Sequence, residues 1–123
     1  MWITFVRLKD VFQVEWRREA TMNLEEFKAS TVQGQTPVGL PAPLTALWRD
    51  AKGDWAGAHA LVDELETPDG MAVHAYLHRK EGQAWNADYW YGRAGRSFHR
   101  PTLEAEWEAL AKGLLASWTT KDR

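Results

Sequence analysis

Beyond residue 42, apolar and polar positions alternate with the period of an α-helix. Apolar residues recur at intervals of three and four, and glycine or proline interrupts the pattern between successive stretches. The pattern predicts helices at about 43–51, 54–65, 69–81 and 83–94, and a last one from about residue 102. The last helix has the most regular pattern, because its large apolar residues share one face over about four turns. These residues are Leu103, Trp107, Leu110, Leu114 and Trp118. We therefore expect an all-α protein.

The first 21 residues fit two kinds of secondary structure. Phe12, Val14 and Trp16 alternate with polar residues, as in a strand. Phe5 and Leu8 also fall at helical spacing with Phe12. No turn signal separates the two halves of the segment, so both alternatives stay open.

Met22 looks like a natural chain start. It precedes Asn23 and an acidic first turn, which favours the beginning of a short helix from about Asn23 to Thr31. Residues 34–43 hold two glycines and three prolines, which is typical of an irregular connector. We therefore expect residues 22–123 to form a single helical domain, and residues 1–21 to be an N-terminal extension that folding does not require.

The helical region contains a weak internal repeat, with units at about 44–65 and 73–94. Small residues allow two antiparallel helices to approach, and a glycine ends the first helix of each unit. The repeat therefore predicts two antiparallel helical hairpins followed by a C-terminal capping helix. The identical positions are Ala46 and Ala75, Gly53 and Gly82, and Ala58 and Ala87.

The second half of each unit resembles a tetratricopeptide-type repeat. Gly82, Ala87, Tyr91 and Ala94 match the glycine, alanine, aromatic and alanine positions of that family, and Gly53-Asp54-Trp55 with Ala58 is similar. The two units are offset by 29 residues instead of 34. The resemblance implies tetratricopeptide-like hairpins and, by analogy, a concave helical surface that binds a protein segment.

Longer stretches are similar to a group of short bacterial helical proteins. These stretches are His74–Gly82 (HAYLHRKEG), Asn86–Tyr91 (NADYWY) and Arg93–Gly95 (RAG). The similarity runs from about Leu47 to Leu115 and supports Met22 as the natural start. It implies a bacterial source and no particular activity.

Composition narrows the classes of partner. The chain is rich in tryptophan, with 8 in 123 residues, and its net charge of −2 favours neither nucleic acid nor a membrane as a partner. The sequence has no cysteine, which excludes a disulfide scaffold and a thiolate metal site and is typical of the cytoplasm. No apolar run approaches the roughly 20 residues of a membrane span. Charged residues Arg7, Lys9 and Asp10 interrupt any signal-peptide core. We expect a cytoplasmic protein.

Two histidines are placed for metal binding. His74 and His78 lie four residues apart on a predicted helix, so their imidazoles share one face. His59, Glu81 or Asp88 would have to supply a third ligand. The spacing also lacks the general-base glutamate of the HExxH zinc motif.

We favour a structural role for the histidine pair, bonded to the backbone or to Tyr76. Zinc sites generally need three or four convergent ligands, and sequence spacing places only His74 and His78 together. We therefore expect no tightly held metal and no cofactor. The alternative is a small metal-binding protein or a metal-dependent enzyme that uses His59, His74 and His78.

Two further groups of polar residues are candidate sites. Arg96, His99 and Arg100, with Arg93 before them, concentrate positive charge ahead of the last helix, where exposed amides could help to bind a phosphate or an acidic peptide. Glutamates 104, 106 and 108 follow closely, so we favour local salt bridges or a solvated face. A hydrolytic triad that uses Ser97 has no surrounding nucleophile motif, so we expect no catalytic residues.

The predicted helix 83–94 is apolar on two sides. Ala87 and Tyr91 share one face, whereas Trp85 and Tyr89 lie nearly opposite. Either the helix is sandwiched between the third and the C-terminal helices, or Trp85 and Tyr89, with Arg93 at their edge, form a contact surface. The favoured function is therefore a non-catalytic module that binds a protein or a peptide, a second copy of the chain included.

Overall fold

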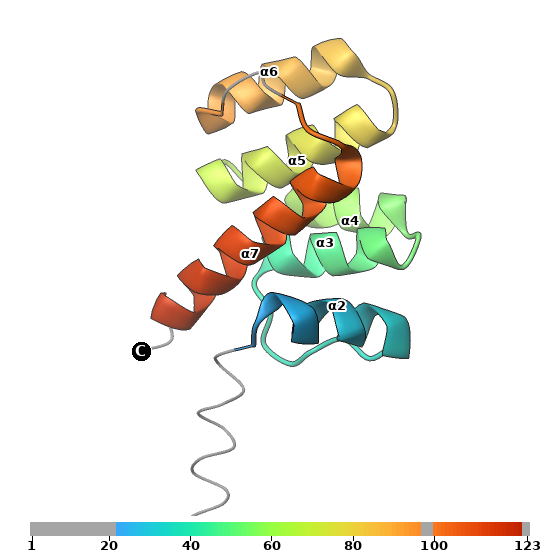
Figure 1. The fold of residues 1–123 in the computed structure, drawn as a ribbon. Coiled ribbons are helices and arrows are strands. Elements are labelled where there is room, and N and C mark those ends of the chain that lie inside the picture. The colour runs from blue at the N-terminus through green and yellow to red at the C-terminus, as the bar shows by residue number, and fades with distance from the viewer. Residues whose placement is uncertain (1–21, 97–99, 122–123) are drawn as a thin grey trace, which may run out of the picture.

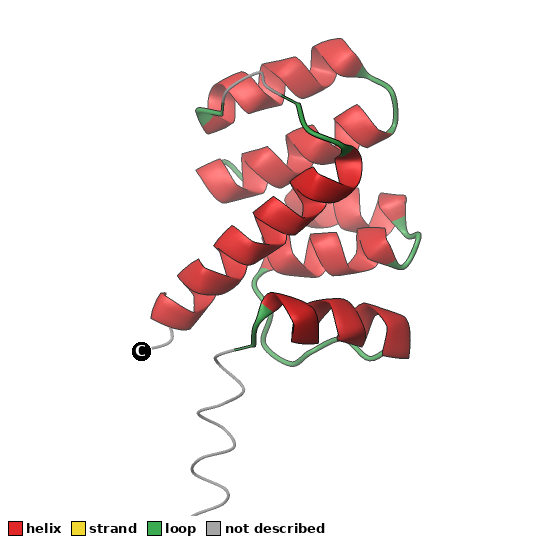
Figure 2. Cartoon of the chain, viewed as in Figure 1, coloured by secondary structure: helices red, strands yellow, loops and turns green. Residues whose placement is uncertain are grey.

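The computed structural model describes residues 22–96 and 100–121, and this part of the chain is helical without strands (Figure 2). The all-α prediction is confirmed, whereas the choice between strand and helix for residues 1–21 lies outside the described residues. None of the described helices is both long and apolar enough to cross a membrane. The helices are α2 (Leu24–Gln33), α3 (Ala42–Ala51), α4 (Trp55–Val62), α5 (Pro68–Lys80), α6 (Ala84–Ala94) and α7 (Leu103–Lys121).

The helices form a stack. The order runs from α2 at one end through α3, α4 and α5 to α6 at the other end, and α7 crosses the stack diagonally (Figure 1). Helices α3 and α4 pack as one hairpin and α5 and α6 as a second, while α7 packs against α2, α3 and α5. Helix α7, which the sequence predicted as a capping helix after the two hairpins, crosses the stack.

The turns within the two hairpins share one geometry. Gly53 and Gly82 have φ values of 88° and 94°, in the left-handed region that favours glycine. The amides that follow, of Asp54 and Gln83, each donate over 2.9 Å to the carbonyl five positions earlier. The internal repeat seen in the sequence thus extends to the backbone conformation of the turns.

Local caps determine where the helices begin. Asp54 accepts a hydrogen bond from the Gly57 amide over 2.9 Å at the start of α4, and Asn23 forms a capping box with Glu26 at the start of α2. Helix α4 ends at Val62, earlier than the expected residue 65. Leu65 packs closely over Gly70 of α5, where an added Cβ would meet the Leu65 side chain at 2.7 Å.

The main core lies where α7 crosses α2, α3 and α5. The rings of Phe27 and Trp107 stack with centroids 5.7 Å apart, and the indole N–H of Trp107 donates to the Leu47 carbonyl over 3.0 Å. Trp48 and Trp118 are also buried there. Three tryptophans therefore serve the core, which accounts for part of the unusual tryptophan content.

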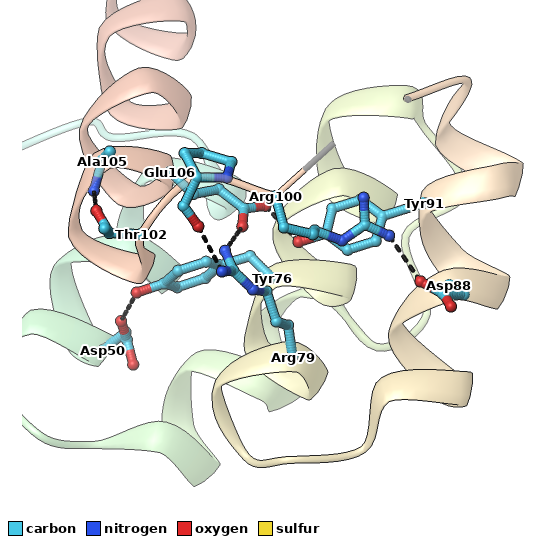
Figure 3. Close-up of polar contacts among 10 residues, drawn as sticks. Asp50, Tyr76, Arg79, Asp88, Tyr91, Arg100, Thr102, Ala105 and Glu106 are labelled. Carbon is cyan, nitrogen blue, oxygen red and sulfur yellow. Dashed lines mark hydrogen bonds and ion pairs between the residues drawn. The ribbon is translucent and has the colours of Figure 1, made fainter. Parts of the chain in front are cut away.

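Buried carboxylates attach α7 and α3 to the second hairpin. Glu106 accepts hydrogen bonds from Arg79 over 2.6 Å and from the Tyr91 hydroxyl (Figure 3). Asp50 of α3 accepts from the Tyr76 hydroxyl over 3.1 Å (Figure 3). Burial, followed by its carboxylate partner, raises the pKa of each tyrosine above the usual range, so both hydroxyls keep their protons and donate.

Candidate metal centre

Three histidines meet between α4 and α5. The Nε2 atom of His74 lies 3.1 Å from that of His59 and 3.0 Å from that of His78. One ring nitrogen from each residue can be chosen so that all three lie within 4.8 Å of one another. Within the described ranges, the side chains of His59, His74 and His78 lie close enough together to hold one metal ion.

The helices position these side chains for simple reasons. His74 and His78 are four residues apart on α5 and so project from the same face. His59 comes from α4, which is held against α5 by the fully buried Ala58 and by the Trp55 indole, whose N–H donates to the Leu77 carbonyl over 2.8 Å. The first hairpin therefore contributes one imidazole and the second contributes two.

The spacing of the nitrogens suits a tetrahedral ion. Zinc binds imidazole nitrogen at about 2.0–2.1 Å, which puts two ligand atoms of a tetrahedral site about 3.3 Å apart. The two Nε2 separations at His74, 3.0 and 3.1 Å, are close to this value.

Hydrogen bonds alone do not satisfy this arrangement. A neutral imidazole nitrogen either donates its one proton or accepts through its one lone pair. The Nε2 atom of His74 therefore makes one good bond and cannot make an equally good second one, although both His59 and His78 lie within reach. A cation bound by three lone pairs would remove this conflict and place the protons on the Nδ1 atoms. Nδ1 of His78 lies 3.7 Å from Glu81, whereas Nδ1 of His74 has no hydrogen-bond partner among the described residues.

Burial keeps the centre in the form that binds metal. The exposed fractions of His74 and His78 are 4% and 7%. Burial, and then the neighbouring histidines, lowers the pKa of His74 to about 4, against the opposing effect of Asp63. Burial likewise lowers the pKa of His78, against the effect of Glu81. Both rings are therefore neutral near pH 7, with lone pairs available.

The surroundings of the rings are aromatic on two sides. The Trp55 ring stacks on His59, with centroids 4.9 Å apart and planes 10° apart, and Trp90 stacks on His74 at 4.2 Å and 27°. Glu81 places a carboxylate oxygen 3.7 Å from Nδ1 of His78. In metal sites such a carboxylate orients the imidazole and raises its basicity.

The structure changes the interpretation of the histidines. It brings His59 to the pair that sequence spacing places together, so three candidate ligands meet, as the alternative interpretation required. Asp88 does not join them, because its carboxylate pairs with Arg100 over 2.6 Å. The expected bond from the histidine pair to Tyr76 is also wrong, since that hydroxyl donates to Asp50.

Sequence reasoning missed the contacts that Trp55 and Trp90 make with the histidines. Trp55 does lie four residues before His59 on a predicted helix, which could have indicated one stacked ring. No comparable local signal relates Trp90 to His74, because they lie on different helices of the hairpin.

The predicted contact residues lie on α6 at the end of the stack. Trp85 and Tyr89 have exposed fractions of 77% and 55%, so the alternative of a helix sandwiched between two others is wrong for this face. The Arg93 guanidinium lies over the Trp90 ring at 5.1 Å and near the Tyr89 ring at 6.0 Å. We call Trp85, Tyr89 and Arg93 the α6 ledge.

The predicted anion patch is partly neutralised by acidic neighbours. Arg100 pairs with Asp88 and lies 3.7 Å from the centroid of the Tyr91 ring (Figure 3). A guanidinium nitrogen of Arg96 lies 3.9 Å from Asp69. His99, and Ser97 of the rejected triad, lie outside the described residues. Of the α7 glutamates, Glu106 pairs with Arg79 and Glu108 pairs with Lys28.

Comparisons with protein-family models, with curated proteins and with solved structures give no match to this chain.

Proposed function

We propose that this protein binds one divalent transition-metal ion through the Nε2 atoms of His59, His74 and His78. The observation that supports the proposal is that Nε2 of His74 lies 3.1 Å from that of His59 and 3.0 Å from that of His78, close to the spacing of ligand atoms in a tetrahedral site. Each of the three residues also offers a ring nitrogen within 4.8 Å of the others. Imidazole suits zinc, copper, iron and nickel. Zinc is the ion we expect, because an all-histidine set of neutral nitrogen donors is typical of zinc sites.

A purely structural cluster explains these residues less well. Such a cluster would be expected to give each buried ring nitrogen a hydrogen-bond partner. Instead, the Nε2 atom of His74 lies within hydrogen-bond distance of both His59 and His78, although it can make only one good hydrogen bond.

Zinc titration of chelator-treated protein tests the proposal. We expect one zinc ion per chain, and a loss of affinity of 100-fold or more, of order 10²–10³, in His59→Phe and His74→Phe. Phenylalanine keeps an aromatic ring beside Trp55 or Trp90 and removes the ligand atom. His99→Phe, at the remaining histidine of the chain, serves as the matched control and should bind zinc like the parent. Absence of stoichiometric binding, or binding that survives in His59→Phe, contradicts the proposal.

As a second function, we propose that the α6 ledge mediates association with a second copy of the chain. Each hairpin in a stacked helical protein buries a face against the next, and α6 ends the stack with two large aromatic rings exposed. Tryptophan, tyrosine and arginine are the residues most enriched in binding hot spots. Trp85→Ala and Tyr89→Ala should therefore reduce the sedimenting mass at high concentration and leave the melting temperature at low concentration nearly unchanged. Strong destabilisation without a change in mass contradicts this proposal.

A further inference from the structure

We infer that the centre formed by His59, His74 and His78 keeps one coordination position for an exchangeable ligand, a water molecule or a small anion. This inference rests on the proposed metal function. It concerns what the bound ion would do beyond holding two hairpins together.

The number of protein donors supports an open position. Structural zinc sites are closed by four protein ligands, whereas sites with three protein ligands hold water or substrate in the fourth position. Within the described ranges, the candidate ligands that come together at this centre are three histidines, and the chain contains no cysteine.

The nearby carboxylates serve other contacts. Glu81 lies beside Nδ1 of His78, on the other nitrogen from the one that faces the centre. Asp88 is held by Arg100. The negative charge of Asp63 acts on His74, but its carboxylate is not grouped with the three histidine nitrogens that lie close enough together to share one ion. Asp63 is therefore the side chain to remove when an open position is tested.

Charge and access favour a small anion as the exchangeable ligand. Three neutral imidazoles leave the charge of a divalent ion uncompensated, and the stacked rings of Trp55 and Trp90 supply no counter-charge. His59 is only half-buried, whereas His74 and His78 are buried, so the α4 side is the less enclosed side of the centre.

Cobalt-substituted protein and azide test the inference. Cobalt(II) takes the place of zinc and has visible bands that report on its ligands. We expect a band from the chelator-treated chain plus cobalt, and a saturable shift of that band with one azide per cobalt ion. Asp63→Asn should show the same shift with the same half-saturation, and His59→Phe should show no cobalt band.

The outcomes separate the inference from the function on which it rests. If cobalt produces no band in the parent protein, the proposed metal function fails. If the band forms and azide leaves it unchanged, or removes cobalt without a shifted intermediate, metal binding stands and the open position is refuted. If azide shifts the band only in Asp63→Asn, that carboxylate is the fourth ligand and the position is closed in the parent.

Discussion

The glutamates at positions 106 and 108 of α7 allow a direct measurement of how burial changes the contribution of an ion pair. Each glutamate pairs with a cation over 2.6 Å, Glu106 with Arg79 and Glu108 with Lys28. The side chains of the first pair are 11% and 22% exposed, and those of the second are 35% and 39% exposed. The two pairs therefore have the same N–O distance, and both glutamates lie on α7. They differ in solvent exposure and in the identity of the cation, which is arginine in one pair and lysine in the other.

We expect Glu106→Gln to lower the free energy of unfolding by about 3 kcal/mol. Removing one partner of a buried pair costs about 3–5 kcal/mol, because the other charge stays buried without compensation. Arg79 keeps some contact with solvent and donates to the Pro101 carbonyl, which places the cost at the lower end. The pair of Lys28 and Glu108 is open to solvent, where water and salt weaken an ion pair, so Glu108→Gln should cost much less than Glu106→Gln.

Urea denaturation followed by circular dichroism measures both losses. If the free energy of unfolding depends on urea concentration with the same slope in each variant, the shift of the urea midpoint converts directly into a change in that free energy. A double variant that combines Glu106→Gln with Arg79→Met should recover part of the loss, since it removes the uncompensated cation as well. Equal losses in the two single variants, or a double variant that is less stable than Glu106→Gln, refute the reasoning.

Two further predictions concern pH and the N-terminal segment. Because burial lowers the pKa of His74 to about 4, the metal-free fold disfavours the protonated ring, and its stability should fall as the pH drops through 6.5 towards 4. Between about pH 7.5 and about pH 5, the free energy of unfolding of the parent should fall by about 2 kcal/mol from this group, measured by urea denaturation with chelator present. In His74→Phe the fall over the same pH range should be smaller by that amount. An equal fall in parent and variant contradicts the assignment to His74. A chain that begins at Met22 should unfold at the parent midpoint, because α2 has its own capping box at Asn23; a loss of several kcal/mol would assign residues 1–21 to the core.

The helices and the histidine pair could be predicted because both depend on local spacing. The period of apolar residues identifies α3 to α7, and four residues on a helix place His74 beside His78. From the sequence, His59 could only be named as a candidate third ligand beside the pair. Its position depends on how α4 lies on α5, which is determined by tertiary contacts such as the bond from Trp55 to the Leu77 carbonyl.

The role of Glu106 was not predicted for a related reason. Its partner Arg79 lies 27 residues away, and the acidic run around it is typical of a solvated face. One signal was present: Glu106 lies three residues after Leu103 and four before Leu110, on the apolar side of the helix. A charged residue at such a position indicates a buried partner.

Aromatic rings in contact run without a break from the histidine centre to the α6 ledge. Trp55 touches His59, His59 touches His74, His74 stacks on Trp90, and Trp90 meets Tyr89 edge-on at 5.1 Å. If the proposed ion binds, it fixes the His74 ring and restrains Trp90, so metal binding and the proposed association at the α6 ledge would share a coupling free energy. Thermodynamic linkage would make that coupling reciprocal: the factor by which the ion changes self-association is the factor by which self-association changes the affinity for the ion.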